Sequence, residues 1–208
     1  MRYWVFLLSL FLAGTAQAKV TSQSEHGFAI VQKAEVDATR EEVYASLLKP
    51  SKYWSPNHSW SGDADNFYIV PKVGGCFCEN IPSADGGTDP TKSGEVEHMR
   101  VIFMQPGKVL RLQGALGPLQ SEAVKGVLTI ALHEADVGDG RKGTAIVFSY
   151  VVGGYMRYKV EEIGSSVDQV IGEQLKRLAA LFETKKNEEE AEKPQAPAAD
   201  PENLEEGR

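Results

Sequence analysis

Alternation of apolar and polar residues predicts β-strands along the central part of the chain. Side chains two residues apart share one face of a strand, so Leu128, Ile130 and Leu132 give one strand a strongly apolar face. Turn residues such as Pro106 and Gly107 separate the alternating segments. We therefore predict strands at residues 28–36, 67–70, 76–81, 95–104, 109–116, 124–134 and 144–152.

A change to helical spacing near the C-terminus predicts one long helix that ends near Glu183. Ser165 with Asp168 is the predicted cap at its start. Gln174 is the only polar residue in the apolar stripe, so it either reaches water at the stripe's edge or anchors a polar ligand group. The stripe consists of Ile163, Val167, Val170, Ile171, Gln174, Leu175, Leu178, Leu181 and Phe182.

Two short helices are predicted after the first strand. Thr39 and Glu42 have the spacing of a capping box, and Pro50 ends the helix that follows. The order of elements is therefore strand, short helices, further strands and long helix. This order predicts an α+β fold in which a curved antiparallel sheet of about six to seven strands wraps around the C-terminal helix.

The N-terminal residues 1–18 have the layout of a secretory signal peptide. Arg2 gives a positive start, an apolar run follows at 5–13, and Ala16 to Ala18 form a small-x-small cleavage site. The alternative is an N-terminal membrane anchor, but the run is shorter than the roughly 20 residues that span a bilayer. We expect an exported protein, periplasmic or secreted, with no stable membrane insertion after the signal is removed.

The C-terminal residues 184–208 form a separable acidic segment. They contain four basic and eight acidic residues, three prolines and a single large apolar residue, Leu204. Such a composition buries too little surface to offset the entropy of ordering, so we predict a disordered tail. The tail carries −4 of the net charge of −7, and residues 19–183 form the predicted single domain. Without a basic stripe, nucleic-acid binding is not expected.

Three motifs in this order make the chain similar to a known family. Residues 36–44 (VDATREEVY) resemble the opening phrase of the START-like superfamily, often called SRPBCC. Residues 71–77 (PKVGGCF) and 143–147 (GTAIV) resemble its Gly-Gly turn and its last strand. That superfamily includes lipid-transfer domains, polyketide cyclases and homologues of the chaperone-ATPase activator. The resemblance implies a helix-grip fold over residues 28–182, with a cavity that takes hydrophobic molecules.

Cys76, Cys78 and His98 are the residues most suited to chemistry. Two residues apart on a regular strand, the cysteines have Cα atoms about 6.6 Å apart, at or beyond the limit for a disulfide. We expect buried structural thiols, with a metal site including His58 or His98, or a strained or redox disulfide, as alternatives. His98 with a carboxylate could perform acid–base work, but a solvated strand face is the expectation.

The function predicted from sequence is the binding of an apolar small molecule, lipid or polyketide-like, between sheet and helix. The alternatives are a cyclase or hydrolase that uses the same cavity, and a chaperone-like interaction protein. No catalytic residue, metal or cofactor is expected, because the known nucleophile, phosphate and zinc motifs are absent from the sequence. The predicted ligand-binding residues are Tyr53, Trp54, Trp60, Phe103, Leu128, Ile130, Phe148, Tyr150, Val170 and Gln174.

Overall fold

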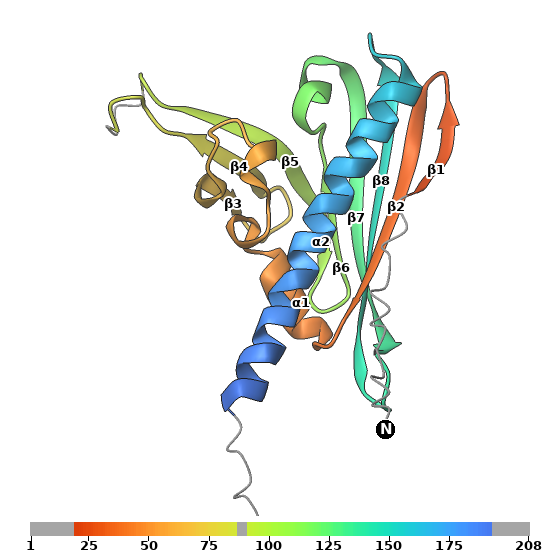
Figure 1. Cartoon of the computed structure of the whole chain (residues 1–208). Coiled ribbons are helices and arrows are strands. Elements are labelled where there is room, and N and C mark those ends of the chain that lie inside the picture. Colours follow the sequence, from red (N-terminus) through yellow and green to blue (C-terminus); the bar gives the residue numbers. More distant parts are fainter. Residues whose placement is uncertain (1–18, 87–90, 193–208) are drawn as a thin grey trace, which may run out of the picture.

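The computed structural model describes residues 19–86 and 91–192, and these form one antiparallel sheet with a long C-terminal helix (Figure 1). The predicted signal peptide and residues 193–208 of the predicted tail lie outside the described residues. The strands are β1 (Lys19–Ser24), β2 (Gly27–Val36), β3 (Phe67–Ile69), β4 (Cys76–Ile81), β5 (Gly94–Gln105), β6 (Val109–Gln113), β7 (Ala123–Asp136) and β8 (Lys142–Tyr155). Their order across the sheet is β1-β2-β8-β7-β6-β5-β4-β3.

The α+β class and the antiparallel sheet are confirmed, but the described residues contain eight strands where six to seven were predicted. The additional strand is β1, which pairs with β2 from Lys19↔Val31 to Ser24↔Gly27. Its sequence, KVTSQS, has no apolar face, and most of it is exposed. Backbone pairing to β2 holds it in place, and side-chain periodicity does not reveal such a strand.

The segment between β2 and β3 contains one α-helix, α1 (Arg40–Leu47), and three single-turn 3-10 helices. The capping box at its start is confirmed, because the Glu42 amide donates to Thr39 Oγ1 and the Thr39 amide donates to Glu42 Oε2. The expected second short helix is replaced by the 3-10 helices η1 (Pro50–Lys52), η2 (Pro56–His58) and η3 (Ala64–Asn66). A fourth 3-10 helix, η4 (Gly117–Ser121), joins β6 to β7.

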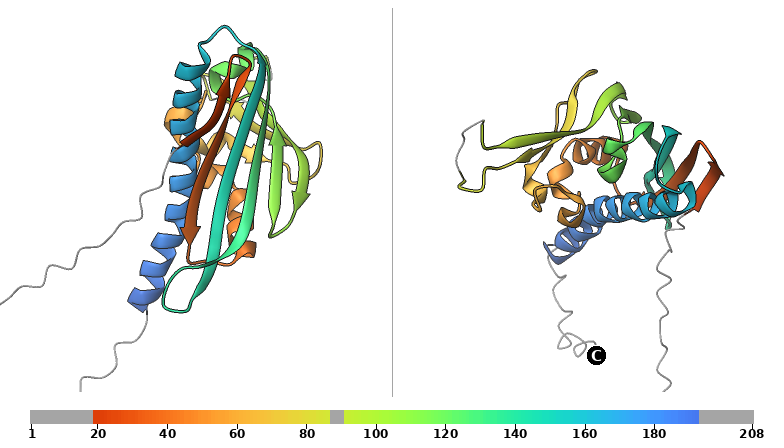
Figure 2. Two further views of the ribbon diagram at one scale, coloured as in Figure 1. Left: turned by 90° about the vertical axis from the view of Figure 1, so that its right-hand side faces the viewer. Right: turned by 90° about the horizontal axis from the view of Figure 1, so that it is seen from above.

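The C-terminal helix α2 (Val160–Glu192) lies along one face of the sheet (Figure 2). It begins before the predicted cap at Ser165, and Glu161 and Glu162 in its first turn suit the positive end of the helix dipole. It also extends past Glu183, so the first part of the predicted tail is helical. No helix among residues 19–86 and 91–192 is long and apolar enough to cross a bilayer.

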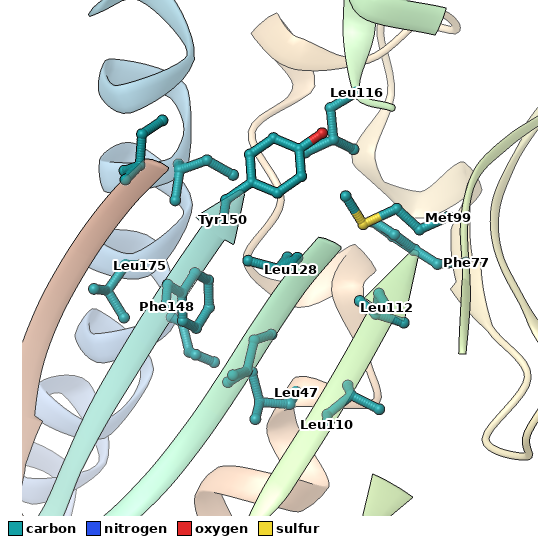
Figure 3. Packing of buried hydrophobic residues seen from close by; sticks show 14 of the residues in the cluster. Leu47, Phe77, Met99, Leu110, Leu112, Leu116, Leu128, Phe148, Tyr150 and Leu175 are labelled. Carbon is teal, nitrogen blue, oxygen red and sulfur yellow. The ribbon is translucent and has the colours of Figure 1, made fainter. Parts of the chain in front are cut away.

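The main hydrophobic core lies between α2, α1 and the concave face of the sheet (Figure 3). Phe148 and Tyr150 on β8 and Leu128 on β7 point into it, and Leu175 meets them from α2. A buried polar contact also joins helix to sheet, where Gln32 Nε2 on β2 donates to Asp168 Oδ1 at 2.6 Å. Toward the N-terminal half of α2 the helix and sheet do not fill the space between them.

Candidate functional site

A cavity of about 290 Å³, here called the main cavity, lies between the N-terminal half of α2, the loop around η2, and the start of η4. Most of its wall is apolar. Trp60, 57% exposed, stands at its mouth. The lining residues are Trp54, Asn57, His58, Ser59, Trp60, His98, Leu116, Gly117, Pro118, Ile163, Ser166, Val167, Val170 and Ile171.

Helix α2 supplies one wall of the main cavity through side chains at helical spacing. Ile163, Val167 and Ile171 are buried at intervals of four residues, so they form one continuous apolar ridge. Ser166 and Val170 lie beside this ridge and complete the wall. The same periodicity that predicted the helix therefore also determines that this wall is apolar.

The opposite wall is a loop that is held onto α2 by hydrogen bonds. Gln174 Oε1 accepts the backbone amide of Ser55 at 2.7 Å, and its Nε2 contacts His58 Nδ1 and the Val170 carbonyl at 3.0 Å each. Arg177 Nε donates to the Tyr53 carbonyl at 2.8 Å. These contacts fix residues 53–58 over the helix, so the cavity is bounded by a loop with defined anchors.

A buried hydrogen-bonded pair, Glu79 on β4 and His98 on β5, lies beside the main cavity, and His98 forms part of its wall. Glu79 is fully buried, His98 is 4% exposed, and Glu79 Oε2 lies 2.9 Å from His98 Nε2. The carboxylate also accepts the backbone amides of Trp60 at 3.2 Å and Ser61 at 2.5 Å. Glu79 therefore connects the cavity's mouth loop to the histidine in its wall.

The pKa values of the two groups are shifted in ways that follow from this environment. Burial lowers the pKa of His98 below its ordinary value of 6.5, although the hydrogen bond and charge of Glu79 act in the opposite direction. Burial alone would raise the pKa of Glu79. The hydrogen bonds from Ser61, Trp60 and His98 outweigh it and hold that pKa below 4.5. At neutral pH the pair is therefore a neutral imidazole beside a carboxylate.

Aromatic side chains enclose the His98 ring and explain its burial. Phe67 stacks on it with ring centroids 5.1 Å apart, and Phe77 lies at 5.5 Å. Trp54 meets Phe77 edge-on at 5.1 Å and carries this cluster to the cavity wall. The imidazole thus sits in an apolar shell in which its nitrogen atoms have few possible partners.

His98 also lines a second, more open hollow of about 420 Å³, here called the outer hollow. It forms where β6 has ended while β5 continues, since β5–β6 pairing stops at Arg100↔Gln113. A Cβ at Gly114 would lie 2.3 Å from the His98 carbonyl, so only glycine allows this close approach. The outer hollow is lined by Glu95, Val96, Glu97, His98, Gly114, Ala115 and Gln120.

The prediction of free, buried thiols at Cys76 and Cys78 is wrong, because the two residues form a disulfide. Their Cα atoms are 5.4 Å apart, closer than on a regular strand. The register of β4 against β5 shifts between Phe77 and Cys78, so the pairing is irregular where the two cysteines come together. Within the described ranges, no group of three His, Cys, Asp or Glu side chains is placed to hold a metal ion.

The structure brings three of the ten predicted ligand-binding residues to the main cavity: Trp54, Trp60 and Val170. The others lie elsewhere. Tyr53, Leu128, Ile130 and Phe148 are packed in the hydrophobic core, around a small void of about 10 Å³. Tyr150 is also in the core, and its hydroxyl donates to the Gly114 carbonyl.

The last two predicted residues, Phe103 and Gln174, have surroundings that the sequence did not predict. Phe103 is 45% exposed, away from the cavity, under the guanidinium of Arg111. Its position on β5 is shifted by the β5–β6 register irregularity between Val101 and Phe103. Gln174 is neither at a wet edge nor a lining residue, because it is fully buried and its amide is used by Ser55, His58 and Val170.

Sequence reasoning missed the contribution of η4 and of Glu79 to the site. Leu116, Gly117 and Pro118 read as the end of a strand and a turn, with nothing to indicate a cavity wall. Glu79 stands beside Cys78 in an apolar strand, and a charged residue in such a strand was a signal that could have been followed. His98 had been considered for acid–base work, but on a solvated face, whereas it is buried.

Comparison with known proteins gives similarity of fold alone. No protein-family model matches the chain, and no curated protein matches its sequence. Protein MLL2253 from Mesorhizobium loti has a TM-score of 0.50 at 19% identity, over 75% of this chain and 97% of that one. SA2116 from Staphylococcus aureus, described as of unknown function, has a TM-score of 0.49 at 15% identity, over 77% of this chain and 98% of that one. CalU16 from Micromonospora echinospora has a TM-score of 0.44 at 15% identity, over 74% of each chain.

Proposed function

We propose that this chain is an exported protein of the START-like superfamily that binds an apolar small molecule in the main cavity. The family assignment is supported by the three sequence motifs and by the single antiparallel sheet with its C-terminal helix. The order of elements, with short helices after an early strand and the long helix last, is the one that the superfamily implies.

The observation that carries the proposal is the main cavity itself. Its volume of about 290 Å³ is just below the range for small-molecule sites, roughly 300–1,000 Å³, so it suits a small ligand. Its wall is mostly aliphatic and aromatic, with a few polar groups among the apolar ones, as binding sites for apolar ligands usually are. The ligand's body would lie against the ridge of Ile163, Val167 and Ile171.

Export is supported by the signal-peptide pattern and by the disulfide. Disulfides persist in oxidising compartments and are rare in the cytosol. The bond between Cys76 and Cys78 is therefore in keeping with a protein that leaves the cytosol. The N-terminal sequence of the mature protein tests whether the protein is exported.

Native mass spectrometry of freshly purified, full-length protein tests the binding proposal. We expect a population whose mass exceeds that of the polypeptide by a discrete small-molecule mass, and we expect organic solvent to extract this molecule. Protein from the producing cell that carries no such molecule, and that binds no added apolar compound, would contradict the proposal.

An enzyme that acts on the bound molecule is the second candidate, favoured by the Glu79–His98 pair. A neutral imidazole held by a carboxylate is a suitable general base, and it lies at the wall of the main cavity. The test is to incubate the extracted molecule with fresh protein and to follow its mass. Conversion that is lost in His98→Phe would favour the enzyme, and an unchanged molecule would favour a carrier.

A further inference from the structure

The free ring nitrogen of His98 is the basis of a further inference about ligand chemistry. His98 Nε2 is engaged by Glu79, while Nδ1 has no hydrogen-bond partner among the described residues. In the described part of the chain, the only fully buried side-chain nitrogen or oxygen without a partner is the Tyr44 hydroxyl. Nδ1 therefore keeps accessible surface, and the spaces that His98 lines are the main cavity and the outer hollow.

The contact with Glu79 determines which nitrogen carries the proton. An ionised carboxylate only accepts hydrogen bonds, so Nε2 must be the protonated nitrogen that donates to it. Burial keeps the ring neutral, so Nδ1 carries a lone pair and no hydrogen. His98 is part of the wall of the main cavity, so a ligand held there would have this nitrogen as its hydrogen-bond acceptor.

The other polar groups near the cavity are already used or lie at its rim. His58 Nδ1 contacts the Gln174 amide, and Gln174 is fully satisfied by its three partners. Asn57, the residue next to His58, is exposed at the mouth. An unpaired acceptor that keeps accessible surface on an otherwise buried side chain is therefore a feature of His98 rather than of the cavity wall in general.

We propose that His98 Nδ1 accepts a hydrogen bond from a hydroxyl of the ligand, so that the cavity selects apolar alcohols or phenols. This inference rests on the proposed function, because it names the chemical class of that same ligand. A hydroxyl supplies the missing donor, whereas a methyl group leaves Nδ1 unpaired and buried by the ligand. A carboxylate is rejected, because it brings a second negative charge close to Glu79 without supplying a donor.

Competition among compounds on one ring skeleton tests this selectivity. The full-length protein is loaded with the neutral probe N-phenyl-1-naphthylamine, which is then displaced by 2-naphthol, 2-methylnaphthalene or 2-naphthoate at neutral pH. The hydroxyl and methyl compounds have nearly the same shape. We expect 2-naphthol to bind about two- to tenfold more tightly than 2-methylnaphthalene, the gain from one neutral hydrogen bond. We expect 2-naphthoate to bind most weakly.

His98→Phe is the matched variant, because it keeps an aromatic ring against Phe67 and Phe77 and removes the acceptor. We expect it to bind 2-methylnaphthalene like the wild type and to lose the preference for 2-naphthol. The same exchange at exposed His133, His133→Phe, should leave the preference unchanged. A preference that survives in His98→Phe would overturn the inference, because another group would then hold the hydroxyl.

A spectroscopic measurement keeps the inference testable even if His98→Phe does not fold. NMR of wild-type protein labelled with ¹⁵N-histidine should show an unprotonated Nδ1 on His98. Its ¹⁵N chemical shift should change when 2-naphthol binds but not when 2-methylnaphthalene binds. An unchanged shift with bound 2-naphthol would overturn the inference. If all three competitors bind equally, only the inference fails, whereas if neither the probe nor any competitor binds, the proposed function fails.

Discussion

Replacing Gln174 with leucine tests whether its amide holds the cavity loop to helix α2. In the wild type Gln174 is fully buried, and its Oε1 accepts the Ser55 amide at 2.7 Å. Its Nε2 contacts His58 Nδ1 and the Val170 carbonyl. Gln174→Leu removes all three contacts and puts an apolar side chain beside the Ser55 backbone amide, which has no other acceptor among the described residues.

The expected cost comes mainly from Ser55, which is 1% exposed. A buried donor that loses its only acceptor costs about 1–3 kcal/mol in the free energy of unfolding. His58 contributes little, because its half-buried side chain can turn to water. For a domain of this size each kcal/mol corresponds to about 2–4 °C, so the melting temperature should fall by roughly 2–12 °C.

Thermal and urea unfolding of Gln174→Leu measure this cost, and hydrogen exchange of the Ser55 amide locates it. Lys176→Leu is the matched control, because the same residue is introduced at an exposed position of α2, where substitutions usually change stability by less than about 0.5 kcal/mol. A Gln174→Leu protein as stable as the wild type, with Ser55 still protected, would refute this reasoning.

Three further predictions follow from the buried pair, the disulfide and the N-terminus. The pKa values of His98 and Glu79 are both lowered in the folded protein, so the stability that the two groups contribute is fully present above pH 6.5. Acidification removes this stability in two stages: the contribution of His98 is lost as the pH falls below 6.5, and that of Glu79 as it falls below 4.5. Urea unfolding from pH 7.5 to 4 should show this loss, and a first stage that persists in His98→Phe would contradict it. When the unreduced protein is denatured and treated with iodoacetamide, Cys76 and Cys78 should not be alkylated, and alkylation of both would show free thiols. N-terminal sequencing of the exported protein should begin at Lys19, and a start at the initiator methionine would disprove removal of the signal.

Periodicity made the main elements predictable, because each has one apolar face. The helix stripe from Ile163 to Phe182 and the alternation around Leu128 and Phe148 depend on nearest neighbours along the chain, which the sequence shows directly. The capping box at Thr39 was predictable for the same reason. Strand β1 was not, because its pairing with β2 uses backbone groups that every sequence carries.

The site was less predictable, because it depends on register and on a loop. Glu79 and His98 meet only because β4 pairs with β5 across a bulge, which shifts the register by an amount that no pattern reveals. The disulfide between Cys76 and Cys78 lies at the same irregularity, which the sequence pattern does not show either. The periodicity placed Gln174 correctly on the inner face of α2, but it did not show that residues 53–58 fold over that face and use its amide.

The central claim is that the main cavity holds an apolar molecule, and filling the cavity tests it most directly. Val170 is half-buried and lines the cavity, so the larger side chain of Val170→Trp can occupy that space without entering the packed core. Gln169→Trp is the matched control, because Gln169 is the exposed neighbour on α2 and does not line the cavity.

The measurement is a fluorescence titration of N-phenyl-1-naphthylamine into ligand-stripped wild type and the two variants, each shown to be folded by circular dichroism. We predict saturable binding to the wild type and to Gln169→Trp, and at least about tenfold weaker binding to Val170→Trp, equivalent to about 1.4 kcal/mol. Equal binding by all three proteins would place the probe elsewhere, and no binding by the wild type would contradict the account.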